Sequence, residues 1–247
     1  MYVDDIATIK ELTNYSSLDE LSETVDKTRY YLSREEYEEL DEEERNQLAL
    51  DRYVKADKSK WQIGRDYELF IGYEYDKDGW EVDYFGIDKQ LEDMGRDLIA
   101  VKGNTVHVIQ CKYWAQHKLI HEKHIAQLYG TTVQYMLGSN PHDQLFLFND
   151  KAVIPVFVTN ISLSETAKCF ADYLNVKVID NKDFGAFPRI KCNINTDEDG
   201  LESKIYHLPM DQQYDRTKVD KPGEFFAFTV KEAVDAGFRR AWRWHGD

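Results

Sequence analysis

Four polar residues have the types needed to cut a phosphodiester with a divalent metal: Glu68, Asp97, Gln110 and Lys112. Such hydrolysis needs a metal to offset charge on the phosphate, an activated water, and help for the leaving oxygen. Asp97 would be the direct carboxylate ligand. The side-chain oxygen of Gln110 and the backbone carbonyl of Cys111 would complete the protein's share of the ligands. Magnesium suits this set because it prefers oxygen ligands and keeps several waters.

The other two residues would act around the metal. Glu68 would hold a metal-bound water from a neighbouring helix. Lys112 would orient or deprotonate the attacking water, or stabilise negative charge on the phosphorane. The spacing of Asp97, Gln110 and Lys112 is a weak signal alone, because it also describes a polar strand end whose side chains face solvent.

The elements around these residues would bring them together. A helix over residues 63–75 would carry Glu68. Residues 97–101 and 106–112 predict two strands of a hairpin, with Asp97 at the start of the first.

The hairpin would gather three of the four residues at one edge of a sheet. Asp97 and Gln110 lie on paired strands and can face the same side. The side-chain period of two places Gln110 and Lys112 on one face and Cys111 on the other.

The chain around the hairpin predicts alternating helices and strands. Because helices separate the last strands, these strands should pair in parallel. The predicted class is α/β, with a central mixed sheet flanked by helices in the order αβββαβ. The remaining expected elements are a strand over residues 80–87, a helix over 122–137, a buried strand over 151–159, a helix from Ser162 or Ser164 through Leu174, and a strand over 176–179.

We expect three segments: an acidic helical extension (1–60), the core domain (61–183) and a small α+β module (184–247). Within the extension, Ser33 and Glu36 form a capping box for a helix continuing to about residue 54.

The formal net charge of −15 argues against a nucleic-acid partner, but the charge is unevenly spread. The first fifty residues hold fifteen acidic and five basic residues. A locally basic cleft elsewhere remains compatible with this distribution. We interpret the acidic helix as a solvated face; a regulatory or DNA-mimicking role is the alternative.

The composition also predicts the compartment. No apolar run approaches the roughly 20 residues that span a bilayer, and the first residues lack the pattern of a signal peptide. Three cysteines, Cys111, Cys169 and Cys192, are odd in number and far apart, which favours reduced thiols. We therefore expect a cytoplasmic protein with no membrane partner.

Two runs of sequence carry a resemblance to a known family. DMGRDLIA (residues 93–100) and VIQCKYW (residues 108–114), followed by an apolar strand ending in Thr159-Asn160, resemble the Mrr-type restriction endonuclease domain of the PD-(D/E)xK nuclease superfamily. The similarity covers roughly residues 62–183.

This resemblance implies a restriction-endonuclease-like core and a Mg²⁺-dependent DNA endonuclease, with Mn²⁺ as a possible substitute. It implies catalytic roles for Asp97, Gln110 and Lys112, and for Glu68. Gln110 replaces the acid of the superfamily motif, as is common in Mrr-type members. This lowers the local negative charge and leaves open whether one or two metals bind.

We expect a metal-dependent DNA endonuclease acting in restriction or defence against foreign DNA, and a homodimer by resemblance. A structure-selective nuclease, such as a junction resolvase, is one alternative. A non-catalytic DNA- or protein-binding module on a nuclease fold is another, although Asp97, Gln110 and Lys112 argue against it. RNA remains open as a substrate.

Basic and aromatic residues outside the motif are candidates for DNA contact. Lys118 and Lys123 follow the catalytic strand. A helix expected over residues 230–242 would lead into a basic and aromatic tail, which could grip phosphates and stack on bases or pack on the core. The tail candidates are Arg239, Arg240, Arg243 and Trp244.

A histidine cluster and Gln127 are further candidates for a role near the site. His117 and His121 have i, i+4 spacing with His124 nearby, but we expect no zinc there. Cys192 is the only cysteine of the C-terminal segment, which argues against a zinc cluster. Gln127 could face the metal site, or lie on the surface.

Overall fold

The computed structural model describes residues 26–84, 96–137, 151–196 and 201–241. The chain divides into two compact units, one of residues 58–187 and one of residues 1–57 together with 188–247. The segments expected as a separate extension and a separate module therefore belong to a single unit.

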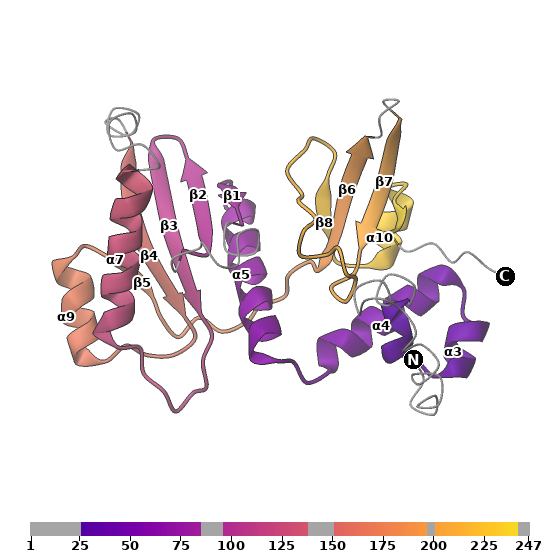
Figure 1. Cartoon of the computed structure of the whole chain (residues 1–247), viewed down its shortest axis with the longest axis horizontal. Helices are drawn as coiled ribbons and strands as arrows, with labels where there is room; N and C mark the ends of the chain where they lie inside the picture. Colours follow the sequence, from indigo (N-terminus) through magenta and orange to yellow (C-terminus); the bar gives the residue numbers. More distant parts are fainter. Residues whose placement is uncertain (1–25, 85–95, 138–150, 197–200, 242–247) are drawn as a thin grey trace, which may run out of the picture. The chain divides into compact units, whose positions relative to one another are not determined.

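The unit of residues 58–187 is built on a five-stranded mixed sheet in the order β1-β2-β3-β4-β5 (Figure 1). The first three strands are antiparallel neighbours, whereas β4 pairs in parallel with β3 and with β5. The predicted hairpin and parallel strands are confirmed. The strands are β1 (Glu81–Asp83), β2 (Leu98–Lys102), β3 (Thr105–Lys112), β4 (Ala152–Thr159) and β5 (Lys177–Ile179).

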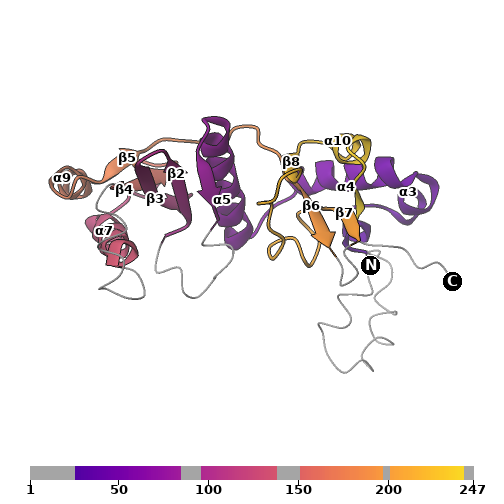
Figure 2. The same cartoon turned by 90° about the horizontal axis from the view of Figure 1, so that it is seen from above.

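Helices cover both faces of this sheet (Figures 1 and 2). On β3, Val106 and Val108 pack in one apolar cluster with residues of α7 (Glu122–Leu137). His107 points to the other face, where its Nδ1 lies 3.0 Å from the Tyr75 hydroxyl of α5 (Lys60–Lys77). Side chains alternate along a strand, so α5 and α7 lie on opposite faces. A third helix, α9 (Glu165–Tyr173), packs against α7.

Hydrogen-bonding side chains set the starts of two of these helices. The Ser59 hydroxyl accepts from the backbone N–H of Gln62, and the Gln62 side chain accepts from that of Ser59, which forms a capping box. This box starts α5 at Lys60, ahead of the expected residue 63. Ser164 caps α9 as one of the two predicted caps.

The other unit contains a four-stranded sheet in the order β8-β6-β7-β9. Helices α4 and α10 pack with β6 and β7 around a core that includes Tyr53, Cys192 and Tyr206. The elements are η2 (Lys27–Tyr30), α3 (Arg34–Glu39), α4 (Glu42–Lys55), β6 (Ile190–Thr196), β7 (Glu202–His207), β8 (Phe225–Ala227), α10 (Val230–Asp235) and β9 (Arg239–Arg240).

The single helix expected up to residue 54 is two helices. The predicted capping box of Ser33 and Glu36 is confirmed for the first. Leu40 then takes an extended conformation, with ψ of 144°, and ends α3. Asp41 caps α4 by accepting from the backbone N–H of Glu44 at 2.9 Å. A strong N-cap residue inside the helical pattern therefore starts a second helix.

The predicted helix over residues 230–242 is wrong beyond Asp235. Gly237 has φ of 84°, a left-handed conformation that ends helices, and Phe238 returns a hydrogen bond to Ala233. Arg239 and Arg240 then form β9 beside β7. The expected strand over residues 80–87 is described only for its first part, because residues 85–95 lie outside the described chain.

Across the described segments, no helix combines the length and the apolar character that crossing a membrane would require.

Candidate active site

Asp97 is fixed at the start of β2. Its backbone N–H donates to the carbonyl of Ile109 at 2.8 Å. Its carboxylate Oδ2 accepts from the backbone N–H of Cys111 at 2.6 Å. The residue is 6% exposed. Both contacts hold the Asp97 carboxylate against the end of β3.

Gln110 lies beside Asp97 on the neighbouring strand. Leu98 pairs with Ile109, so the register places Asp97 one step beyond this pair, next to Gln110. Gln110 is fully buried, and neither its Oε1 nor its Nε2 has a hydrogen-bond partner among the described residues. An unsatisfied buried polar group costs about 1–3 kcal/mol, so this amide has unused capacity to bind a ligand.

Lys112 ends β3, opposite Thr159 of β4. It follows Gln110 by two residues, so the two side chains project from the same face of the sheet. Lys112 is half-buried. Asp97, Gln110 and Lys112 are thus brought to one end of the hairpin.

Glu68 approaches this end from the helix on the other face. It is half-buried on α5. Burial raises the pKa of the Cys111 thiol, the negative charges of Asp97 and Glu68 add to the rise, and Lys112 opposes it. Cys111 points toward α5, and the charge of Glu68 acts on its thiol, so Glu68 lies near the end of β3.

His124 also lies near Lys112, which the sequence did not indicate. Burial lowers the pKa of His124, and the charges of Lys112 and Lys123 lower it further. Its ring packs edge-on against Trp114, with the ring centroids 5.0 Å apart. Its buried Nε2 has no hydrogen-bond partner in the described chain. The only sequence signal was its position near the start of the helix after the motif.

The donor set fits a hard cation better than zinc. Among the residues that the structure describes, no three His, Cys, Asp or Glu side chains cluster as a metal site. The Asp97 carboxylate instead lies next to Gln110, whose amide has no hydrogen-bond partner among the described residues. Carboxylate and amide oxygens suit Mg²⁺, which completes its coordination with water.

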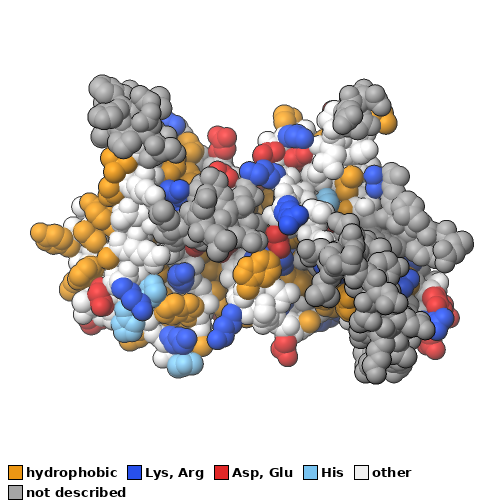
Figure 3. Space-filling view, in the orientation of Figure 1, with side chains coloured by type: hydrophobic (Ala, Val, Ile, Leu, Met, Phe, Trp, Pro, Cys, Tyr) orange, Lys and Arg blue, Asp and Glu red, His pale blue; other side chains and the backbone are white. Residues whose placement is uncertain are grey.

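The loop between β3 and α7 is tied to the end of β4. The Asn160 amide accepts from the Trp114 N–H and donates to the Trp114 carbonyl, both at 2.8 Å. Beyond Trp114, a pocket of about 370 Å³ is lined by Lys118, Lys123 and three histidines. Lys, Arg and His side chains gather over this loop in Figure 3. Lys118 and Lys123 are both exposed, as contact with phosphate would require.

The other predicted site residues lie elsewhere. Arg240 is 2% exposed, and its guanidinium is engaged by Asp26, Asp211 and Asn46. Its guanidinium is therefore not available to contact DNA, and the prediction that Arg240 binds DNA is wrong. Gln127 is exposed on α7.

The remaining tail candidates are only partly described. Arg239 is half-buried and donates to the carbonyl of Arg240. Arg243 and Trp244 lie outside the described residues.

A five-stranded mixed sheet flanked by helices, with an acid, an amide and a lysine at the end of its hairpin, defines a restriction-endonuclease-like α/β domain. Residues 62–187, just over half of the chain, match the Mrr catalytic family model, described as restriction endonuclease. The chain therefore belongs to this restriction endonuclease family.

Two solved structures are similar to the chain. A protein of unknown function, AF1548, has 17% identity and a TM-score of 0.34 over 49% of this chain and 58% of its own. The MspJI restriction endonuclease in complex with a 27-mer oligonucleotide has 14% identity and a TM-score of 0.33 over 60% of this chain and 32% of its own. This chain thus spans less than two thirds of either protein. No curated protein matches it.

Proposed function

We propose that the protein is a metal-dependent DNA endonuclease. One observation carries the proposal: the buried, unpartnered amide of Gln110 beside the fixed Asp97 carboxylate, with Lys112 on the same face. Family membership supports the same class of reaction.

Asp97 and Gln110 would hold the metal, with the Cys111 carbonyl as a further ligand and Glu68 acting through water. Bound Mg²⁺ would offset phosphate charge and lower the pKa of a coordinated water. The hydrogen bond from Cys111 to the Asp97 carboxylate orients that ligand without a rearrangement on binding. Mn²⁺, with similar oxygen preference, would substitute.

Lys112 would work on the attacking water and the reacting phosphate. Its Nζ would orient the water or accept its proton, and when protonated would stabilise negative charge on the phosphorus oxygens. Because Lys112 is partly buried, solvent screens its Nζ less, and its contacts with the attacking water and the phosphate oxygens are stronger. Glu68 would assist by positioning water on the α5 side.

The basic loop after β3 would bind the DNA backbone. Lys118 and Lys123 are exposed beside the site, and lysines that neutralise phosphates bind DNA without regard to sequence. We propose a role in restriction or defence, in the cytoplasm. A homodimer would supply the two active sites that cutting both strands needs.

Supercoiled plasmid provides the test. We expect nicked or linear product with Mg²⁺ or Mn²⁺ and none with EDTA. Equal conversion in EDTA, or intact plasmid in both metals at micromolar protein, would refute metal-dependent cleavage. Branched and linear duplexes compared at equal concentration separate a general endonuclease from a junction-selective one.

A further inference from the structure

A second polar pocket lies in the unit that lacks the candidate active site. On its central strands, Cys192 and Tyr206 face the apolar core, so Asn193 and His207 face the other side. The chain after β7 folds over this polar face. Lys191 fastens it there, with its Nζ donating to the carbonyls of Tyr214 and Thr217 at 2.9 and 2.8 Å.

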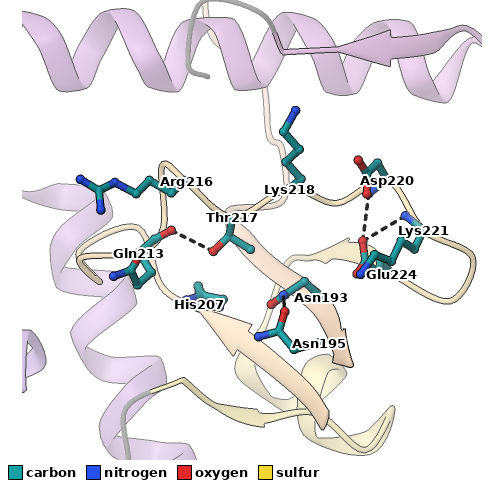
Figure 4. A pocket seen from close by; sticks show the side chains of 10 residues that line it. All are labelled: Asn193, Asn195, His207, Gln213, Arg216, Thr217, Lys218, Asp220, Lys221 and Glu224. Atoms are coloured by element: carbon teal, nitrogen blue, oxygen red, sulfur yellow. Dashed lines mark hydrogen bonds between the residues drawn. The ribbon is translucent and has the colours of Figure 1, made fainter. Parts of the chain in front are cut away.

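The space between this sheet face and the loop is about 560 Å³ (Figure 4). This volume is within the range of roughly 300–1,000 Å³ that is usual for small-molecule sites. Asn193 and His207 form its inner part, while Arg216 and Lys218 extend outward from the loop (Figure 4).

Two polar atoms of the inner part lack partners. Asn193 is 8% exposed and His207 is 6% exposed. Asn193 donates through Nδ2 to Asn195, but its Oδ1 has no hydrogen-bond partner in the described chain, nor does Nδ1 of His207. Buried polar groups are nearly always satisfied, so both atoms have hydrogen-bonding capacity left for a ligand or a water.

The inner part accepts hydrogen bonds. Burial lowers the pKa of His207 to about 4, so its ring is neutral at pH 7 and one of its nitrogens is an acceptor. With Oδ1 of Asn193, this gives up to two acceptors side by side. They fit a ligand that carries amino or ring N–H donors.

The outer part is cationic. Arg216, Lys218 and Lys221 line it against two acids, Asp220 and Glu224. Backbone bonds hold one group of each sign: the Glu224 carboxylate accepts from three N–H groups at 2.7–3.0 Å, and the Lys221 Nζ donates to the carbonyl of Ile194 at 3.0 Å. With three cations against two acids, the rim keeps a small excess of positive charge, which favours an anionic group.

We propose that this pocket binds a nucleoside monophosphate unit, with its phosphate on the cationic rim and its base edge on Asn193 and His207. A nucleobase supplies the N–H donors, and a phosphate supplies the anion. The unit could come from a free nucleotide or from an unpaired nucleotide of a DNA strand. The pocket and the candidate active site share no residue, so this proposal is independent of the proposed function.

Calorimetry on the full chain in EDTA tests the proposal. The probes are the four deoxynucleoside 5′-monophosphates, a short single-stranded oligodeoxynucleotide and inorganic phosphate. We expect at least one nucleotide probe to bind at least tenfold more tightly than inorganic phosphate. Tighter binding of the mononucleotide identifies a free nucleotide as the source, and tighter binding of the oligonucleotide identifies a DNA strand.

Variants locate that binding. Asn193→Leu should weaken it at least tenfold by removing the buried acceptor. Arg216→Ala changes an exposed residue and should weaken nucleotide binding severalfold. Lys231→Ala, on the surface of α10 and outside the pocket, should leave it unchanged. Absence of nucleotide binding up to millimolar concentration, equal affinity for inorganic phosphate, or wild-type affinity in the Arg216 variant overturns the proposal.

Discussion

The amide of Gln110 is buried beside the Asp97 carboxylate and has no hydrogen-bond partner within the described chain. If it serves as a ligand, stability and metal binding should respond to its replacement in opposite directions. Gln110→Leu replaces an unsatisfied polar side chain with an apolar one of similar volume. We therefore expect the free energy of unfolding of the metal-free protein to be unchanged or to rise by about 1 kcal/mol. Its affinity for Mn²⁺ in calorimetry should fall at least tenfold.

Two matched variants complete this experiment. Gln110→Glu restores an oxygen ligand with a negative charge and should retain Mn²⁺ binding. Gln134→Leu makes the same change at an exposed position of α7 and should alter neither property. Wild-type Mn²⁺ affinity in the Gln110→Leu variant would show that the amide does not ligate metal.

At this scale the sequence predicted the positions of the hairpin residues better than the surroundings of residues outside the hairpin. Asp97, Gln110 and Lys112 lie on two paired strands, and strand register follows from local sequence alone. His124 and Arg240 depend on contacts distant in sequence. Arg240 looked like a surface cation because its two acidic partners, Asp26 and Asp211, could not be assigned to it.

At the scale of elements, the end of β4 positions the basic loop. Asn160 makes two hydrogen bonds to the backbone of Trp114. Asn160→Ala should cost roughly 2 kcal/mol, at about 1 kcal/mol for each lost bond, and should weaken DNA binding by releasing the loop that carries Lys118.

Urea unfolding and DNA-binding titrations measure both effects. Asn104→Ala, at an exposed turn position, is the control and should behave as wild type. An Asn160→Ala protein with unchanged stability would mean that the two bonds do not hold this loop.

The sequence predicted most elements because their hydrophobic periods and caps are local. α7 and the parallel pair β4 and β5 match the expectation within one residue or so. The predicted helices are wrong where a single residue interrupts a helix although the hydrophobic pattern continues past it. Asp41 starts a second helix in the N-terminal segment, and Gly237 with φ of 84° ends α10 early.

At the scale of the whole molecule, a buried ionic cluster joins segments from the two ends of the chain. Arg240 bonds Asp26, Asn46 and Asp211 within one unit. Arg240→Ala should cost about 3–5 kcal/mol because it leaves buried carboxylates without their cation. Urea unfolding measures this loss.

The control for that experiment is Lys231→Ala, which removes an exposed cation of the same unit and should change stability by less than about 0.5 kcal/mol. Equal effects of the two variants would contradict the role of the cluster. The sequence could not predict that the N-terminal and C-terminal segments pack together. The apolar face of a helix such as α4 shows that the helix packs against another element, but it does not show which element that is.

Buried neutral histidines should make the fold sensitive to mild acid. Burial lowers the pKa of His107 and of His207 to about 4 from an ordinary value of 6.5. Between pH 6.5 and 4 the unfolded chain binds more protons, so stability falls as the pH falls through this window, by up to about 3 kcal/mol for each ring.

Urea unfolding at pH 7.5, 6 and 5 measures this dependence. His107→Gln should flatten part of the slope, whatever its effect on stability at pH 7.5. An unchanged slope in that variant would show that His107 is not held in its neutral form by the fold.

Cleavage of supercoiled plasmid by paired variants tests the central claim most directly. Asp97→Asn and Lys112→Ala should reduce the Mg²⁺-dependent rate by at least a hundredfold while circular dichroism and thermal unfolding stay near wild type. Asp172→Asn and Lys151→Ala make the same changes at exposed positions and should cut at the wild-type rate. Cleavage at the wild-type rate by folded Asp97→Asn and Lys112→Ala proteins would contradict the assignment of this site.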